Sequence, residues 1–256
     1  MCRLAAYAGP PLALERLLLQ PQHNLCEQAY APQEMVRGLL CADGYGFGWY
    51  DDQQQPRIYT NCLPIWSDGN LPDLAATMTA PLWLANVRSA TPGQAVNLAN
   101  TQPFRSNSLM YLHNGYLEGF NAGLRHRFHE HLDTDLAASL QGNCDSEYLF
   151  ALILQHLKLT ADIATAIGDA LGALETMLEG RQALLGLIMT DGRKLYALRH
   201  GLGCDPPSMY SLSGDPDYPG AVLFASERLT DSQQWQPVPS GEVVLADASG
   251  ALAATA

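Results

Sequence analysis

The sequence predicts an α+β fold, because strand-like segments lie at both ends of the chain and helical segments lie in the middle. Short apolar and aromatic runs, typical of strands, occur in the first 115 residues, and a period of two returns from residue 182. Residues 145–178 show the spacing of amphipathic helices. No internal repeat or linker divides the chain. We therefore expect one domain over residues 1–256, with helices layered outside sheets.

The first half of the chain contains several short predicted elements. Apolar or aromatic runs between turn residues predict strands over residues 2–8, 45–50, 57–59, 82–88 and 108–113. Gly9-Pro10-Pro11 and Asn114-Gly115 are typical of breaks, so we expect them to end the first and last of these strands. Leucine spacing predicts short helices over 12–19 and 71–78, and we expect a loop over 22–43.

The second half of the chain gives stronger patterns. Apolar spacing predicts helices over residues 145–157 and 161–178. Asp191-Gly192 between two apolar runs predicts a hairpin of strands 184–189 and 195–199. Further strands are expected over residues 209–212, 222–225 and 243–245.

Composition narrows the classes of function. The net charge of −12 argues against binding to nucleic acid or to an anionic membrane surface. No apolar run approaches the roughly 20 residues that span a bilayer, and the start lacks the pattern of a signal peptide. The six cysteines form no Cys-x-x-Cys pair, which indicates reduced thiols without a disulfide framework or structural zinc. We therefore expect a cytoplasmic protein that binds a small molecule.

Cys2 is a candidate nucleophile. Only Met1 precedes it, and we expect Met1 to be removed because the next side chain is small. Cys2 would then carry a thiol and an α-amine, and an α-amine with a pKa of about 8 accepts a proton at neutral pH. The alternative is an inert packing cysteine, which is the commoner use of a thiol.

Two later segments offer groups that hold an amino acid. Arg88 and Thr91 follow a predicted strand, where a guanidinium and a hydroxyl suit a carboxylate. The alternative for Arg88 is a surface salt bridge. Asp145 starts a predicted helix and suits an ammonium group, although a helix cap is the simpler interpretation.

Asn114 and Gly115 are candidates for an oxyanion hole. The side-chain amide of Asn114 and the backbone N–H of Gly115 could both donate hydrogen bonds to a developing negative charge. The alternative is a hairpin turn, because Asn-Gly is a preferred pair in two-residue turns.

One enzyme family carries these residue types in the same order. The sequence resembles the glutaminase domain of class II (N-terminal nucleophile) glutamine amidotransferases at Cys2, Arg88, Thr91, Asn114, Gly115 and Asp145. The resemblance implies that these residues attack the γ-amide, hold the α-carboxylate, form the oxyanion hole and hold the α-amine. It also implies a four-layer αββα sandwich and amide hydrolysis that needs no metal or organic cofactor.

The resemblance extends to one subfamily. The segments MCRLAAYAGP, QAYAP, ADGYGFGWYDD, LPIWSDGN, NVRSATPG and LHNG are similar to hydrolases of γ-glutamyl hercynylcysteine sulfoxide in ergothioneine biosynthesis. This similarity implies hydrolysis of that γ-glutamyl amide to glutamate and hercynylcysteine sulfoxide. One alternative is a glutaminase subunit that supplies ammonia to a synthase on another polypeptide, since the chain shows no second catalytic region. The other is a binding module of the same fold without activity.

The implied leaving group carries a trimethylated ammonium, which aromatic faces and carboxylates bind well. We expect these groups among Trp66, Asp68, Tyr45 and Trp49, whose alternative is ordinary packing in the core. Two positions depart from the broader family, because Asn86 and Gln102 stand where histidines are frequent.

Two further motifs are weak. Gly44-x-Gly46-x-Gly48 leads into acidic residues and no helix, so it does not predict a phosphate site. His126, His129 and His131 lack a matching set of ligands, so we expect a solvated segment and no metal site.

Overall fold

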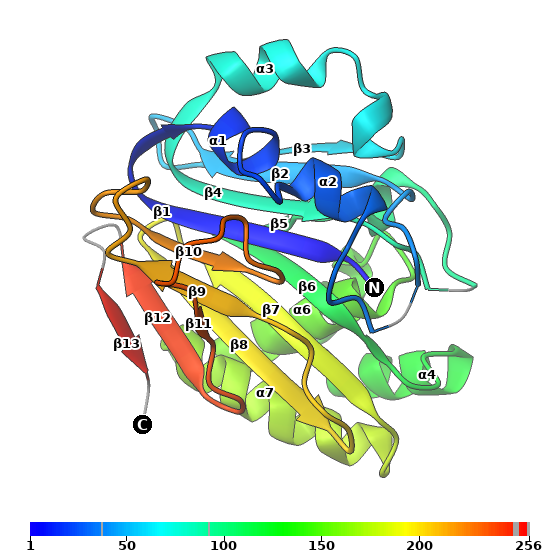
Figure 1. Ribbon diagram of the computed structural model, residues 1–256. Coiled ribbons are helices and arrows are strands. Elements are labelled where there is room, and N and C mark those ends of the chain that lie inside the picture. Colours follow the sequence, from blue (N-terminus) through cyan, green and yellow to red (C-terminus); the bar gives the residue numbers. More distant parts are fainter. Residues whose placement is uncertain (37, 92, 248–250, 255–256) are drawn as a thin grey trace.

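Two antiparallel sheets form the centre of the molecule (Figure 1). The computed structural model describes residues 1–36, 38–91, 93–247 and 251–254. The first sheet has the order β11-β9-β10-β1-β4-β2-β3. Its strands are β1 (Arg3–Ala13), β2 (Tyr45–Tyr50), β3 (Pro56–Asn61), β4 (Thr79–Val87), β9 (Tyr210–Ser213), β10 (Val222–Ala225) and β11 (Gln236–Pro237). The second sheet has the order β13-β12-β8-β7-β6-β5. Its strands are β5 (Phe104–Ser106), β6 (Leu109–Leu117), β7 (Ala183–Thr190), β8 (Lys194–Leu202), β12 (Val243–Asp247) and β13 (Leu252–Ala254).

Helices cover both outer faces of the paired sheets (Figure 1). The first sheet carries α1 (Glu15–Leu18), α2 (Leu25–Tyr30) and α3 (Leu71–Thr77), with the short 3₁₀ helix η1 (Ile65–Ser67) beside them. The second sheet carries α4 (Ala122–His131), α6 (Asp145–Leu157) and α7 (Ile163–Leu178), and α5 (Thr134–Ser139) contacts α6. A second 3₁₀ helix, η2 (Leu98–Asn100), lies in the connection between β4 and β5.

Three apolar cores separate four layers. Alternate residues of β1 explain the arrangement, because Leu4 and Ala6 pack between the sheets whereas Ala5 and Tyr7 pack under the first helices. A third core joins the second sheet to α4, α6 and α7. Period-two burial on both faces of both sheets therefore gives an αββα sandwich. The α+β class and the four layers are confirmed.

The boundaries of the N-terminal elements differ from the prediction. Gly9-Pro10-Pro11 does not end β1, because the strand absorbs these residues in a register shift between Ala8 and Leu12. Leu12 and Ala13 then pair with β4, which limits α1 to the four residues from Glu15. The loop expected over 22–43 contains α2, whose first turn is capped by the side chain of Asn24.

Elements of the second half agree better with the sequence. The helix over 145–157, a helix within 161–178, and the hairpin around Asp191-Gly192 are confirmed. The prediction that Asn114-Gly115 ends a strand is wrong, because both residues lie inside β6 and pair with β7. The hairpin-turn alternative for this pair is therefore excluded. The sequence also did not predict α4, α5 or β5.

The glycines of the Gly44-x-Gly46-x-Gly48 motif serve packing between the layers. A Cβ on Gly46 would overlap the carbonyl oxygen of Gln102, and one on Gly48 would lie 2.6 Å from the sulfur of Met110. Only a residue without a side chain lets β2 approach this segment so closely.

The three histidines of residues 126–131 lie on α4. His129 contacts the hydroxyl of Tyr148, and His131 stacks on His156. Within the described ranges, no three metal-binding side chains form a group. In the same part of the chain, no helix is long and apolar enough to cross a membrane.

A buried ion pair joins the start of β1 to the segment that follows β10. The guanidinium of Arg3 lies 2.8 Å from the carboxylate of Glu227, and both side chains are buried. Burial alone would raise the pKa of Glu227, but hydrogen bonds from His23 and two backbone N–H groups, with the charge of Arg3, lower it to about 2. The carboxylate therefore stays ionised in the folded protein across the physiological range.

This pKa predicts part of the acid sensitivity of the fold. A carboxyl whose pKa falls from 4.5 to about 2 on folding contributes stability above pH 4.5, and this contribution is lost as the pH falls toward 2. We expect Glu227 to account for about 2 kcal/mol of the loss in unfolding free energy between pH 6 and pH 3. Urea unfolding of wild type and Glu227→Gln at both pH values measures this difference, and equal losses in the two proteins would contradict it.

Candidate active site

The candidate nucleophile lies at the end of the first sheet, between the layers. Arg3 pairs with Val87 and Leu4 with Asn86, so the register brings Cys2 opposite Arg88. Leu4 and the next even-numbered residues of β1 face the second sheet, and Cys2 continues this side of the strand. Cys2 is buried, and its sulfur contacts the carbonyl oxygen of Ser89 at 4.0 Å.

Arg88 is a buried cation without a counter-ion. Its guanidinium donates to the carbonyl oxygens of Asp43 and Ala95, and it forms no ion pair with a described carboxylate. The surface salt bridge considered from the sequence is therefore excluded, since only 3% of Arg88 is exposed. A buried charge is costly unless it is paired, so this position favours an anionic ligand.

Asp145 is the matching buried anion. Its carboxylate accepts hydrogen bonds from the backbone N–H groups of Leu117 and Ser146 and from the side chain of Gln94. It is 3% exposed and pairs with no cation among the described residues. The helix cap considered from the sequence is not its role, because the N-cap of α6 is Cys144. An ammonium group would supply the missing charge.

One loop connects the two charges. The carbonyl oxygen of Ala95 accepts from Arg88, and the neighbouring Gln94 donates to Asp145 at 3.2 Å. Thr91 starts the turn that precedes them, since its carbonyl oxygen accepts from the N–H of Gln94, and Thr91 itself is exposed. The adjacent residues Gln94 and Ala95 therefore join a buried cation to a buried anion, which is the charge pattern that suits a zwitterionic amino acid.

Asn114 lies on the face of the second sheet that packs against the first sheet, the same inter-sheet layer that contains Cys2. Met110 and Leu112 of β6 pack between the sheets, so Asn114 continues on the same side. Gly46 of β2 lies against Gln102, which hydrogen-bonds the backbone of His113. Asn86 of β4 pairs with Leu4 on one side and with Gly46 on the other, so Gly46 lies in register with Leu4. The contacts through Gln102 therefore place Asn114 near the end of the sandwich that carries Cys2.

The amide of Asn114 is fully buried with neither its nitrogen nor its oxygen bonded to a described partner. A buried polar group without a partner costs free energy, about 1–3 kcal/mol. Such a group in a folded protein is a candidate for contact with a ligand or a bound water molecule. The Nδ2 of Asn114 is therefore a buried donor that no described residue uses.

Gly115 is required by the packing of β6. A Cβ at this position would overlap the carbonyl oxygen of Leu184 and would lie 2.5 Å from the ring of His113. We expect Gly115→Ala to lower the unfolding free energy by about 3 kcal/mol, because backbone atoms must shift to relieve the overlap. The matched control is Gly172→Ala in α7, where no atom lies within 4 Å and alanine stabilises a helix by about 0.5–1 kcal/mol. Chemical denaturation measures both, and equal effects would contradict the packing argument.

His113 and Gln102 support the site without lying in the candidate set. The ring of His113 contacts the hydroxyl of Ser146 at 2.9 Å and the carbonyl oxygen of Leu184 at 3.2 Å. Burial lowers the pKa of His113 although Asp145 opposes this shift, so a neutral ring links β6 to the start of α6. Gln102 pairs with the backbone of His113 in both directions. Sequence patterns do not reveal these supports, because each depends on a contact between different elements of the fold.

The four candidates for the leaving-group side fall into two sets. Tyr45 and Trp49 lie on the helix-covered face of the first sheet, the face opposite Cys2, among its core aromatics. Asp68 is occupied there by the hydroxyls of Tyr45 and Tyr59 and by Asn61. These three positions therefore match the packing alternative. Trp66 differs, because it is 42% exposed and, among the described rings, makes only a T-shaped contact with exposed Tyr30.

Asn86, one of the two departures from the broader family, lies in the same inter-sheet layer. Its side-chain nitrogen donates to the carbonyl oxygen of Arg3 at 3.4 Å, and its oxygen has no partner among the described residues. Asn86 and Gln102, the two positions that depart from the broader family, therefore each contact the backbone of a strand that carries candidate site residues. This arrangement is compatible with an intact site.

Comparison with known proteins decides the family. Residues 33–203 match the family described as Glutamine amidotransferases class-II. The chain belongs to this family. A solved structure of a class-II glutamine aminotransferase domain protein from Silicibacter pomeroyi is 26% identical, with a TM-score of 0.74 over 99% of this chain and 97% of that one.

Two further similarities concern activity and fold. A γ-glutamyl-hercynylcysteine sulfoxide hydrolase from Mycolicibacterium smegmatis is 29% identical over 95% of both proteins. The glutamine phosphoribosylpyrophosphate amidotransferase of B. subtilis shares the fold over 99% of this chain and 49% of that one, with 18% identity and a TM-score of 0.64. The fold is thus that of the N-terminal nucleophile amidotransferases, and the family supports a hydrolase that acts on amide bonds.

Proposed function

We propose that the chain hydrolyses a γ-glutamyl amide bond, most specifically that of γ-glutamyl hercynylcysteine sulfoxide, with Cys2 as the nucleophile. The observation that carries the proposal is the pair of buried, unmatched charges of Arg88 and Asp145. A glutamyl group presents an α-carboxylate to the first and an α-ammonium to the second. The name of the 29% identical relative supports the choice of leaving group.

The proposed mechanism uses groups of the chain alone. After removal of Met1, the α-amine of Cys2 takes the thiol proton, and the thiolate attacks the γ-carbonyl carbon. The side-chain N–H of Asn114 and the backbone N–H of Gly115 donate to the oxyanion that forms. The ammonium then returns its proton to the leaving nitrogen, and the C–N bond breaks to leave a thioester. Water, deprotonated by the same amine, hydrolyses the thioester to glutamate and restores the thiol.

The substrate is tested by parallel assays with γ-glutamyl hercynylcysteine sulfoxide and with glutamine. We expect a higher kcat/KM for the sulfoxide, because an enzyme selects substrates by differential binding of their transition states. Turnover of glutamine alone would replace the proposal with the glutaminase-subunit alternative, since the same zwitterion site accepts glutamine. Turnover of neither substrate by protein that has lost Met1 would favour a binding module.

The role of Asp145 gives a quantitative prediction. Asp145→Asn keeps the shape of the side chain but removes the charge, so we expect KM for either γ-glutamyl substrate to rise roughly 10–100-fold. The value of kcat should change much less, because the charge pairs with a group that does not react. Asp73→Asn is the matched control, since Asp73 is an exposed aspartate in the first turn of α3. A KM unchanged in Asp145→Asn would remove Asp145 from the substrate site.

A further inference from the structure

An N-terminal nucleophile poses a structural problem that an internal residue does not. Once Met1 is removed, no preceding peptide holds Cys2, so its orientation depends on its own carbonyl group and on tertiary contacts. In this protein the carbonyl oxygen of Cys2 accepts a hydrogen bond of 2.7 Å from the Nε of Arg3. This contact involves only atoms that remain after processing.

Arg3 is itself held by a saturated carboxylate. The Oε1 of Glu227 accepts from the guanidinium of Arg3 at 2.8 Å and from the N–H of Glu34 at 3.0 Å. The Oε2 accepts from the ring of His23 at 2.7 Å and from the N–H of Gln33 at 2.9 Å. A carboxylate offers about four acceptor positions, so Glu227 has no freedom to rotate away from Arg3 without losing several bonds.

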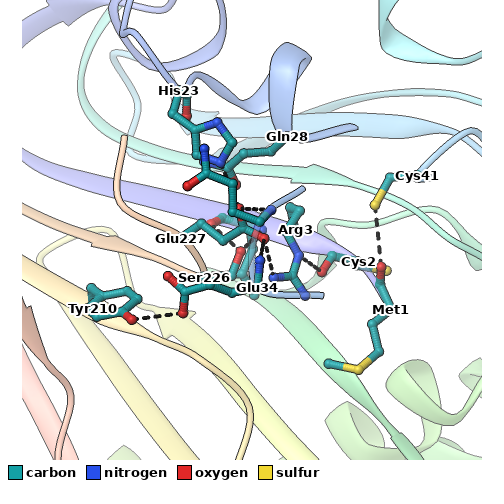
Figure 2. A network of polar contacts seen from close by, with 12 residues as sticks. Met1, Cys2, Arg3, His23, Gln28, Glu34, Cys41, Tyr210, Ser226 and Glu227 are labelled. Atoms are coloured by element: carbon teal, nitrogen blue, oxygen red, sulfur yellow. Dashed lines mark hydrogen bonds and ion pairs between the residues drawn. The ribbon is translucent and has the colours of Figure 1, made fainter. Parts of the chain in front are cut away.

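The same network reaches the loop that borders Met1 and Cys2 (Figure 2). The side chain of Glu34 accepts from the hydroxyl of Tyr210 at 2.8 Å, which fixes the loop at its start. Further along, the thiol of Cys41 donates to the carbonyl oxygen of Met1 at 3.4 Å, a contact that is lost when Met1 is removed. Glu227, which follows β10, thus joins the beginning of β1 to the backbone of Gln33 and Glu34 at one buried point.

We propose that Glu227 is a positioning residue for the nucleophile: through Arg3 it fixes the carbonyl group of Cys2, and with it the directions of the thiol and the α-amine. The proposal rests on the proposed role of Cys2. Arg88 and Asp145 lie on other elements and do not contact Glu227. Loss of this positioning should therefore lower kcat and leave KM nearly unchanged.

Two variants test the proposal. Glu227→Asp withdraws the carboxylate by one methylene, and Arg3→Lys keeps the positive charge but cannot bond both Cys2 and Glu227 with a planar fork. For each we expect kcat to fall roughly 10–100-fold with KM within about threefold of wild type, because misplacement by about 1 Å costs up to 10²-fold. Alkylation of Cys2 by iodoacetamide, localised by peptide mass spectrometry, should show a slower rate and an altered pH dependence.

A remote variant separates positioning from simple loss of stability. Tyr50 is the last residue of β2, at the end of the strand far from Cys2. Its buried hydroxyl donates to the carbonyl oxygens of Ser108 and Thr190. Tyr50→Phe should lower the melting temperature without changing kcat or the alkylation of Cys2.

The proposal is overturned if either folded variant retains kcat within twofold of wild type. It is also overturned if KM rises as much as kcat falls, or if neither variant accumulates as folded protein, since Glu227 would then serve the fold alone. Failure of the proposed function is a different result, in which wild type hydrolyses no γ-glutamyl amide. The alkylation rates of Cys2 in wild type and variants still report on positioning in that case.

Discussion

Cys2→Ala should abolish turnover while the protein folds normally. Without the thiol no thioester can form, so we expect kcat to fall by at least about 10³-fold, as removal of a covalent nucleophile commonly does. The fold should lose about 1 kcal/mol or less, because the side chain is small and its sulfur forms only one hydrogen bond to a described residue, a weak one at 4.0 Å to the carbonyl oxygen of Ser89. Steady-state assays and thermal unfolding of the same preparation measure the two quantities.

The matched control for this variant is Cys204→Ala. The thiol of Cys204 also contacts a backbone carbonyl, that of Ala183, at 3.3 Å, but it has no place in the proposed mechanism. We expect full activity from this variant. Residual turnover in Cys2→Ala would overturn the role of Cys2, and intact-mass evidence of Met1 on active protein would exclude its α-amine as the base.

The sequence suggests which residues of the candidate site could carry chemistry, but it does not show their geometry. Residue types at Cys2, Arg88 and Asp145 carry chemical information by themselves, because a guanidinium and a carboxylate suit opposite ends of an amino acid. Their burial and lack of counter-ions cannot be seen in the sequence, since both depend on which strands lie side by side. The structure adds those properties, and they strengthen the binding interpretation over a surface salt bridge or a helix cap.

Local signals failed where tertiary pairing was stronger. Asn114-Gly115 resembles a turn, yet eight residues of β7 pair with β6 and carry the strand through it. Gly9-Pro10-Pro11 likewise does not stop β1, because β4 pairs with the strand on both sides of the bulge. The aromatic candidates Tyr45 and Trp49 match the packing alternative for a related reason. Both lie at odd-numbered positions of β2, which face the helices, and the face of a strand is set by its register.

Asn114→Leu should lower activity without lowering the stability of the fold. Leucine has nearly the shape of asparagine but no donor, so we expect kcat to fall roughly 10²–10³-fold, the usual cost of one oxyanion donor. Stability should be unchanged or increase by about 1 kcal/mol, because the amide is buried with no described partner and its replacement removes an unmet hydrogen-bonding requirement. Kinetics and urea unfolding of one preparation give both values.

Tyr111→Phe is the matched control on the same strand. The hydroxyl of Tyr111 is also buried without a described partner, but Tyr111 belongs to the core on the helix side of β6. Removing it should stabilise the fold to a similar degree with no change in kcat. An active Asn114→Leu would show that the unpaired amide serves no oxyanion. A strongly destabilised Asn114→Leu would instead mean that the amide has a structural partner, and that its buried atoms are not held ready for a substrate.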